Sequence, residues 1–100
     1  MIAEIQCLPT PAGTADARYA HVDAAIAAVR ASGLRTEVGP LGTSMEGPPD
    51  EVWAALRSAH EACLHSGATS AVTVIKVAEG AEHGPDSGPG IDDLVGPHRS

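Results

Sequence analysis

The residue whose type and setting most suggest chemistry is Glu46, in a stretch over residues 39–51 that is dense in turn formers. Met45 and Gly47 flank it, and glycine lets a ligand approach the backbone closely. A carboxylate there is suited to accept hydrogen bonds from an amino-heterocycle or to balance a cation. The spacing leaves a structural alternative open, in which Glu46 caps the following helix or pairs with a nearby arginine.

A second candidate is the segment HEACLH over residues 60–65, a near match to the H-E-x-x-H zinc helix. His60 and His65 are five positions apart, which turns the second ring roughly 140° from the first on an α-helix. A zinc site needs both rings on one face, and His60 with Cys63 supplies two ligands at most. We therefore expect no metal, with His60 at the helix–sheet margin and His65 in solvent.

Neither of the two cysteines of the chain is expected to be a catalytic nucleophile. A reactive cysteine needs a strand end or elbow that presents the thiolate to a base. Cys63 instead falls on the apolar stripe of a predicted helix, and Cys7 falls in a predicted strand. Both are interpreted as small buried hydrophobic residues. With neither a G-x-G-x-x-G motif nor a P-loop, the sequence favours a protein that is not an enzyme and needs no cofactor.

Composition limits the class of partner. The formal net charge is −7, and the chain has a single lysine and five scattered arginines. Nucleic acids and anionic membranes call for clustered basic residues, so neither is an expected partner. An acidic chain better suits a neutral or cationic small ligand. No apolar stretch reaches the roughly 20 residues that span a bilayer, and no signal peptide is recognised, so we expect a cytoplasmic protein.

Length and core composition favour one domain that self-associates. One hundred residues make one domain, and 43% of them are hydrophobic, with one Trp, one Tyr and no Phe. Such a core is thin, so burial against other copies would add stability. We expect a homo-oligomer, a dimer or a tetramer.

Hydrophobic periodicity predicts the element order β-α-β-β-α-β. The predicted strands cover residues 2–8, 34–38, 43–46 and 70–77, and the predicted helices cover 14–32 and 50–66. Pro9 and Pro11 should end the first strand because proline cannot donate to a ladder. The expected apolar stripes are Tyr19, Val22, Ile26 and Val29 on the first helix, and Val52, Leu56, Ala59 and Cys63 on the second.

This order predicts an α+β fold of the ferredoxin-like type, a sandwich of a four-stranded antiparallel sheet with two helices on one face. The other face would be open, and the residues placed on it include Glu4, Gln6, Val72, Val74 and Lys76. That mixture is too apolar for a solvated surface and too polar for a dry core. It suits a face that meets a ligand, another subunit, or both.

The last part of the chain differs in kind. Eight of the 22 residues over 79–100 are Gly or Pro, and five acids face one arginine. Such a composition buries too little apolar surface to offset its ordering entropy. We therefore divide the chain into a domain over 1–78 and an acidic tail over 79–100 that is mostly flexible, with one helical turn over 91–95.

The motif L-G-T-x-x-E-G over residues 41–47, followed by D-E-V over 50–52, resembles the thiamine-binding protein family of small ferredoxin-like domains. Pro40, and segments 32–34, 60–62, 66–68 and 72–76, agree with it. The resemblance covers roughly residues 3–78. The chain departs from the family at Ser70, where an arginine is usual, and in its tail, which is commonly helical and charged.

The resemblance implies a domain that pairs through its sheets and binds thiamine or its hydroxymethylpyrimidine moiety without catalysis. The positions that it makes ligand candidates, together with polar residues expected on the open face, are Glu4, Gln6, Thr43, Ser44, Glu46 and Lys76. Thiamine is a cation with an aminopyrimidine ring, which acidic and polar side chains complement. Its phosphorylated forms would need basic partners, and only Lys76 is expected nearby.

Two functions remain open from the sequence. The first is a carrier or sensor in thiamine metabolism that binds the unphosphorylated vitamin or its pyrimidine half. The second is a structural or regulatory ferredoxin-like module that only oligomerises. Loss of ligand affinity in Glu46→Ala with the assembly intact would favour the first.

Overall fold

The computed structural model describes residues 1–81 and 88–99, and it has the predicted element order with a short C-terminal addition. The elements are β1 (Ile2–Thr10), α1 (Ala20–Ala31), β2 (Arg35–Val38), β3 (Thr43–Glu46), α2 (Pro49–His65), β4 (Ser70–Ala78), α3 (Ile91–Val95) and the 3-10 turn η1 (Gly96–His98).

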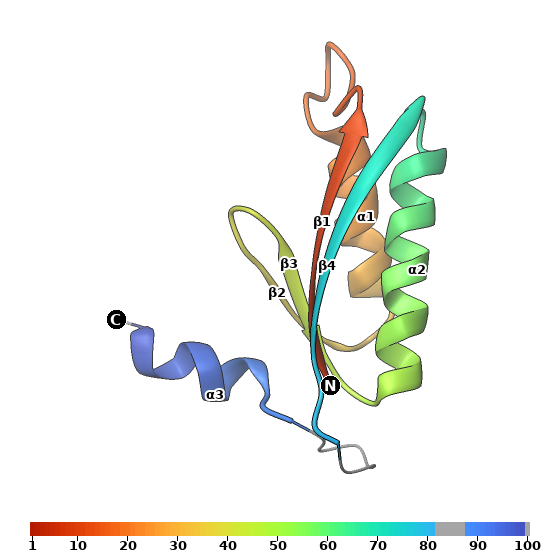
Figure 1. Cartoon of the computed structure of the whole chain (residues 1–100). Helices are drawn as coiled ribbons and strands as arrows, with labels where there is room; N and C mark the ends of the chain where they lie inside the picture. The colour runs from red at the N-terminus through yellow and green to blue at the C-terminus, as the bar shows by residue number, and fades with distance from the viewer. Residues whose placement is uncertain (82–87, 100) are drawn as a thin grey trace.

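The four strands form one antiparallel sheet in the order β2-β3-β1-β4. Helices α1 and α2 pack together against one face of this sheet, while α3 contacts β3 with its first residues and projects outward at its far end (Figure 1). This arrangement confirms the predicted ferredoxin-like fold. Strand β4 forms one edge of the sheet and β2 forms the other.

The core lies between the sheet and the two helices. Alternation along β1 directs Ala3, Ile5 and Cys7 toward the helices, as predicted, and all three are buried. The predicted stripe of α2 is also confirmed, since it is entirely buried. The buried hydrophobic cluster consists of Met1, Ala3, Ile5, Cys7, Ala25, Val29, Met45, Val52, Ala55, Leu56, Ala59 and Cys63.

The start of α1 was predicted too early. The helix begins at Ala20 rather than at Thr14. The amide of Thr14 donates to the carbonyl of Ala17, and the Thr14 hydroxyl accepts from the amide of Ala17, so Thr14 closes a separate turn. The predicted stripe is also wrong at Tyr19, which is 57% exposed, whereas His21 is buried in its place.

Strand β1 continues through Pro9 to Thr10, two residues beyond the predicted end. The carbonyl of Thr10 accepts from the amide of Thr69 next to β4, and backbone groups alternate along an antiparallel strand. The nitrogen of Pro9 therefore faces away from β4, where no ladder bond is required of it. The proline is accommodated because its missing donor lies on the side that β3 does not reach.

The C-terminal segment folds back onto the sheet face that α1 and α2 leave open. Helix α3 occupies the residues predicted to form one helical turn, and its Ile91 is only 1% exposed. The predicted flexibility of the tail stays a prediction, and residues 82–87 and 100 lie outside the described residues.

Candidate ligand site

A cavity of about 390 Å³ lies where α1, β1 and the turn between β2 and β3 meet. We call it the hairpin cavity. Its lining residues are Ile5, Gln6, Cys7, Leu8, Tyr19, Val22, Asp23, Ala25, Ile26, Val29, Gly39, Pro40, Leu41, Gly42 and Thr43. It is thus on the side of the sheet that the helices cover, and the Leu41-Gly42-Thr43 part of the sequence motif forms one wall.

The cavity exists because β3 is short. Its four residues pair with β1 only as far as Ile5, which faces Thr43, while β1 runs on to Thr10. The turn then bends close over β1. A Cβ atom on Gly42 would lie 2.9 Å from Cγ of Glu4 and 3.2 Å from the carbonyl oxygen of Ile5, so glycine permits this close approach.

Thr43 is the polar side chain most closely tied to the cavity. The residue as a whole is 4% exposed and lines the cavity. Its hydroxyl makes no hydrogen bond within the described part of the chain, where no fully buried side-chain oxygen or nitrogen lacks a partner, so this hydroxyl is open to the cavity. A ligand that entered the cavity could form a hydrogen bond with this hydroxyl, for a net gain of about 0.5–1.5 kcal/mol.

The backbone of Cys7 adds a second polar feature. The same alternation that turns Thr10 toward β4 turns the N–H and C=O groups of Cys7 toward the side of β3. The β1–β3 ladder stops at Ile5, so these two groups border the cavity instead of a neighbouring strand. They offer a donor and an acceptor at the spacing of a strand edge.

The mouth of the cavity carries two side chains from the start of α1. Tyr19 and Asp23 lie four positions apart, which places them on the same side of the chain at the helix start, and both line the cavity. Asp23 supplies a carboxylate and Tyr19 an exposed aromatic ring. Among the described lining residues none is basic, so the mouth favours a cation over an anion.

The predicted site residues do not converge on one place. Thr43 lies on the helix-covered face, because it is three positions from Glu46 and side chains alternate along a strand. The register places Ser44 beside Glu4, and Glu4 beside Lys76, on the open face. Lys76 Nζ lies 3.9 Å from the Glu4 carboxylate. Gln6 is also on β1 and borders the hairpin cavity.

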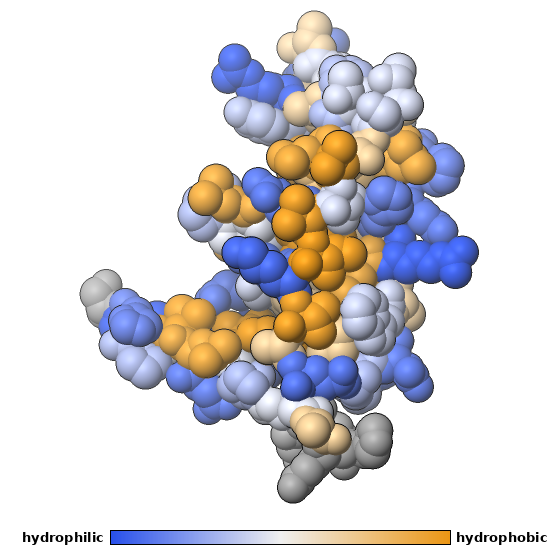
Figure 2. All heavy atoms as spheres, viewed as in Figure 1, coloured by the Kyte–Doolittle hydropathy of each residue, from blue (hydrophilic) through white to orange (hydrophobic). Residues whose placement is uncertain are grey.

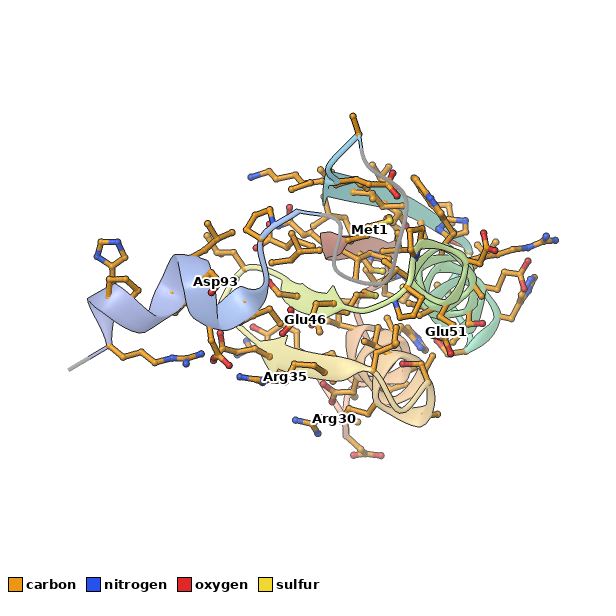
Figure 3. All side chains as sticks on the ribbon, turned by 90° about the horizontal axis from the view of Figure 1, so that it is seen from below. Met1, Arg30, Arg35, Glu46, Glu51 and Asp93 are labelled. Atoms are coloured by element: carbon orange, nitrogen blue, oxygen red, sulfur yellow. The ribbon has the colours of Figure 1, made fainter. Side chains whose placement is uncertain are left out.

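Glu46 lies under the C-terminal segment. Its carboxylate accepts a hydrogen bond of 3.3 Å from the amide of Ile91, and Figure 3 shows it on β3 beside the start of α3. A Cβ atom on Gly90 would come within 2.3 Å of the Glu46 carboxylate, so the glycine allows the contact. Glu46 therefore bonds to the start of α3. This contact differs from the two structural alternatives considered from the sequence, a cap on the following helix and a pair with a nearby arginine.

Ion pairs between two charged residues of the same segment and two of β2 also hold the segment against the sheet. Asp92 accepts from Arg35 at 2.9 Å and from Arg99 at 2.7 Å, and Arg99 also donates to Glu37 at 2.6 Å. Hydrogen bonds from Arg99 and Arg35 lower the pKa of Asp92 below its ordinary value of 3.8. Bonds to Asp92 and Glu37 raise the pKa of Arg99.

The histidine segment makes no metal site in the described part of the chain, where no three potential ligands gather. His60 is half-buried and its Nδ1 lies 2.6 Å from the hydroxyl of Thr73 on β4, which matches the predicted place at the helix–sheet margin. His65 is exposed. Within residues 1–81 and 88–99, no helix has the length and apolar character needed to cross a membrane.

A family model described as thiamine-binding protein matches residues 3–85. The chain belongs to this family. UPF0045 protein CPE1503 of Clostridium perfringens is 32% identical over 74 residues, which are 73% of this chain and 75% of that protein. The family name points to a role related to thiamine, and neither match indicates a catalysed reaction.

Solved structures share the fold of this member of the thiamine-binding protein family. A domain of unknown function, DUF77, from Bacillus cereus has a TM-score of 0.78 and 31% identity over 99% of this chain and 89% of that one. A Thermotoga maritima protein described as a candidate thiamine biosynthesis or salvage protein has a TM-score of 0.74 and 21% identity, covering 99% of this chain and all of that one.

The sequence interpretation missed the cavity residues Cys7, Tyr19 and Asp23. Tyr19 was assigned to the core stripe of a longer helix, and Asp23 follows it by one helical turn. The signal that was available is the unequal length of the paired strands: a four-residue strand beside a longer one leaves a stretch of strand edge uncovered.

Proposed function

We propose that this protein binds thiamine or its hydroxymethylpyrimidine half in the hairpin cavity, without catalysing a reaction, as a carrier or sensor. The observation that supports the proposal is the hydroxyl of Thr43, which is open to a cavity whose wall includes the Leu41-Gly42-Thr43 part of the motif. Its volume of about 390 Å³ falls in the range of roughly 300–1,000 Å³ typical of small-molecule sites.

The polar groups of the cavity suit an aminopyrimidine ring. Such a ring presents an amino donor next to a ring-nitrogen acceptor, and the strand edge at Cys7 presents an acceptor and a donor. The Thr43 hydroxyl can serve either role. Val22, Ile26 and Leu41 supply apolar walls for the faces of the ring. A flat heterocycle bonded along one edge and packed on its faces would satisfy all of these groups.

The cavity mouth suits the positively charged thiazolium ring. Asp23 supplies an opposite charge, and Tyr19 supplies an aromatic face that attracts cations. A phosphate group in the same place would meet Asp23 and no basic lining residue. The proposal therefore favours the unphosphorylated vitamin over thiamine diphosphate.

Calorimetric titration with thiamine, hydroxymethylpyrimidine and thiamine diphosphate tests this assignment in wild type and Asp23→Asn. We expect the substitution to weaken thiamine binding about two- to fivefold, the effect of one exposed ion pair. Binding of the neutral pyrimidine should not change, which makes it the matched control. Tightest binding of the diphosphate, or an equal loss for both uncharged and charged ligands, would contradict the proposal.

Self-association through β4 is the second part of the proposal. This nine-residue edge strand exposes apolar side chains on both faces: Val72 (65%), Val74 (42%), Ile75 (41%) and Val77 (40%). Figure 2 shows apolar side chains gathered in a band along it. A long apolar edge is a template for pairing with another strand, and a second copy of β4 would complete it by a two-fold axis.

A further inference from the structure

The edge strand β2 has few interactions of its own that hold it on the sheet. None of its four residues is buried, and it pairs with β3 alone. Strand β3 is equally short, and two such strands make a hairpin that is only marginally stable by itself. The order of the β2–β3 hairpin therefore depends on what packs against its two faces.

The C-terminal segment over residues 90–99 holds this hairpin from the open face of the sheet. The amide of Ile91 donates to the Glu46 carboxylate on β3, and Asp92 accepts from Arg35, which faces Glu46 in the register. Figure 3 shows Arg35 and Glu46 on neighbouring strands next to α3. Ile91 is 1% exposed although it lies outside the core cluster, so it serves as a separate apolar anchor for the segment.

A further contact of the segment lies nearer the turn of the hairpin. Arg99 donates to Glu37 at 2.6 Å, and Glu37 faces Ser44 in the register. The next pair along the hairpin is Val38 with Thr43, and Thr43 lines the hairpin cavity from the other face of the sheet. The contacts on the open face thus end one residue away from the cavity wall.

We propose that docking of the C-terminal segment and ligand binding in the hairpin cavity are linked through the β2–β3 hairpin. With the segment docked, the hairpin is held on both faces, and its turn keeps the close approach to β1 that forms the cavity wall. With the segment released, the support on the open face is lost, so the turn and Thr43 become less ordered. A ligand that fits the ordered wall binds the docked state more tightly and therefore favours docking in return.

The linkage has two parts that are tested separately. The first part, in which the segment orders the hairpin, needs no ligand. The second part, in which the ordered hairpin favours ligand binding, rests on the function proposed above. Failure of the proposed function would therefore leave the first part standing or falling on its own result.

The ligand-free test is hydrogen exchange of the full chain, read by mass spectrometry, in the double variant Ile91→Ala/Asp92→Asn. These substitutions remove most of the apolar anchor and the carboxylate that accepts from two arginines. We expect exchange over residues 35–46 to rise about threefold to tenfold, the effect of two exposed ion pairs. Exchange over β4 should stay unchanged. Unchanged exchange over residues 35–46 would overturn the proposal.

Single substitutions separate this effect from a general loss of stability. Asp92→Asn should show part of the increase over residues 35–46, whereas Asp92→Glu keeps the carboxylate and should stay close to wild type. Glu61→Gln removes an exposed ion pair on α2 and should leave exchange in the hairpin unchanged. Equal increases over the hairpin and over β4 in the double variant would indicate general destabilisation and overturn the proposal.

The ligand test uses thiamine, and it requires effects of similar size in both directions. Saturating thiamine should slow exchange at Ile91 in the wild type, and calorimetry should show that the double variant binds thiamine more weakly by a similar factor. Equal affinity of the two proteins for thiamine would overturn the linkage while leaving the cavity as the ligand site. Absence of thiamine binding to the wild type would overturn the proposed function together with the second part of the linkage.

Discussion

At the scale of single residues, Thr43 is the side chain on which the proposed site most depends. Its hydroxyl is open to the cavity, in a wall otherwise formed mainly by apolar groups. A polar group in such a wall can fix the orientation of a ligand. Thr43 thus links the family's motif to the cavity.

Thr43→Val keeps the side-chain volume and removes the hydroxyl. We expect thiamine affinity to fall roughly fivefold to tenfold, the value of one hydrogen bond of about 1 kcal/mol, while Thr43→Ser retains most of it. Calorimetric titration measures the difference. Ser44→Ala is the matched control, since Ser44 lies next in sequence but on the opposite face. A larger loss in Ser44→Ala than in Thr43→Val would place the ligand on the open face.

The sequence predicted the strand that carries Thr43 but grouped its residues incorrectly. Strand β3 covers residues 43–46 as predicted, and its alternation buries Thr43 and Met45 while Ser44 and Glu46 stay on the other face. Thr43 and Glu46 were both treated as open-face candidates, although an odd separation along a strand rules that out. The contact between Glu46 and Ile91 joins segments 45 positions apart, and no local pattern encodes it.

At the scale of elements, the sequence predicted those with strong periodicity and erred where local hydrogen bonds decide. Helix α2 begins and ends within one residue of its predicted bounds, because Pro49 and Gly67 mark them. The start of α1 was missed by six residues, since the turn closed by Thr14 looks in sequence like a helix cap. Tyr19, which lies just before the observed helix start, lines the cavity instead of the core, so this part of the site was missed with the helix start.

The docked C-terminal segment gives a prediction at the same scale. Asp92 has a lowered pKa, so the stabilisation it gives the docked state is complete above its ordinary value of 3.8 and is lost as the pH falls through the lowered pKa. Asp92→Asn should remove it at neutral pH and make the amide of Ile91 exchange severalfold faster. Hydrogen exchange read by mass spectrometry measures this.

The control for the docked segment is Glu61→Gln, which removes a surface ion pair with Arg57 on α2, far from α3 in the sheet–helix arrangement. It should leave exchange at Ile91 unchanged. Salt should weaken the docking of the segment in the wild type, because the Arg35–Asp92 and Arg99–Glu37 ion pairs are exposed and therefore screened. Unchanged exchange in Asp92→Asn would show that Ile91 burial alone holds the segment.

At the scale of the whole molecule, β4 determines how copies could meet. Backbone alternation turns the N–H and C=O groups of Val72 and Val74 toward β1 and those of Thr73 and Ile75 toward the free edge. The outward groups are available to a second strand, and the apolar side chains beside them would be buried by it. A chain of 100 residues buries only part of its apolar surface, and here some of the surface that remains exposed lies along β4.

Ile75→Pro tests assembly through this edge. It removes a backbone donor that faces outward, so the ladder with β1 should survive while pairing with another copy is blocked. We expect light scattering to give an oligomer mass for wild type and a monomer mass for the variant, with circular dichroism unchanged. Trp53→Ala changes an apolar side chain on α2 that is 50% exposed, against 41% for Ile75, and it should keep the oligomer. A monomeric wild type would contradict the assembly.

The most direct test of the central claim is to follow the amide NMR signals of ¹⁵N-labelled protein while thiamine is added. If the vitamin binds in the hairpin cavity, the largest shifts should fall at Cys7, Asp23 and Thr43, with Glu4 and Lys76 little affected. Shifts concentrated at Glu4, Ser44 and Lys76, or no shifts at saturating thiamine, would contradict the account.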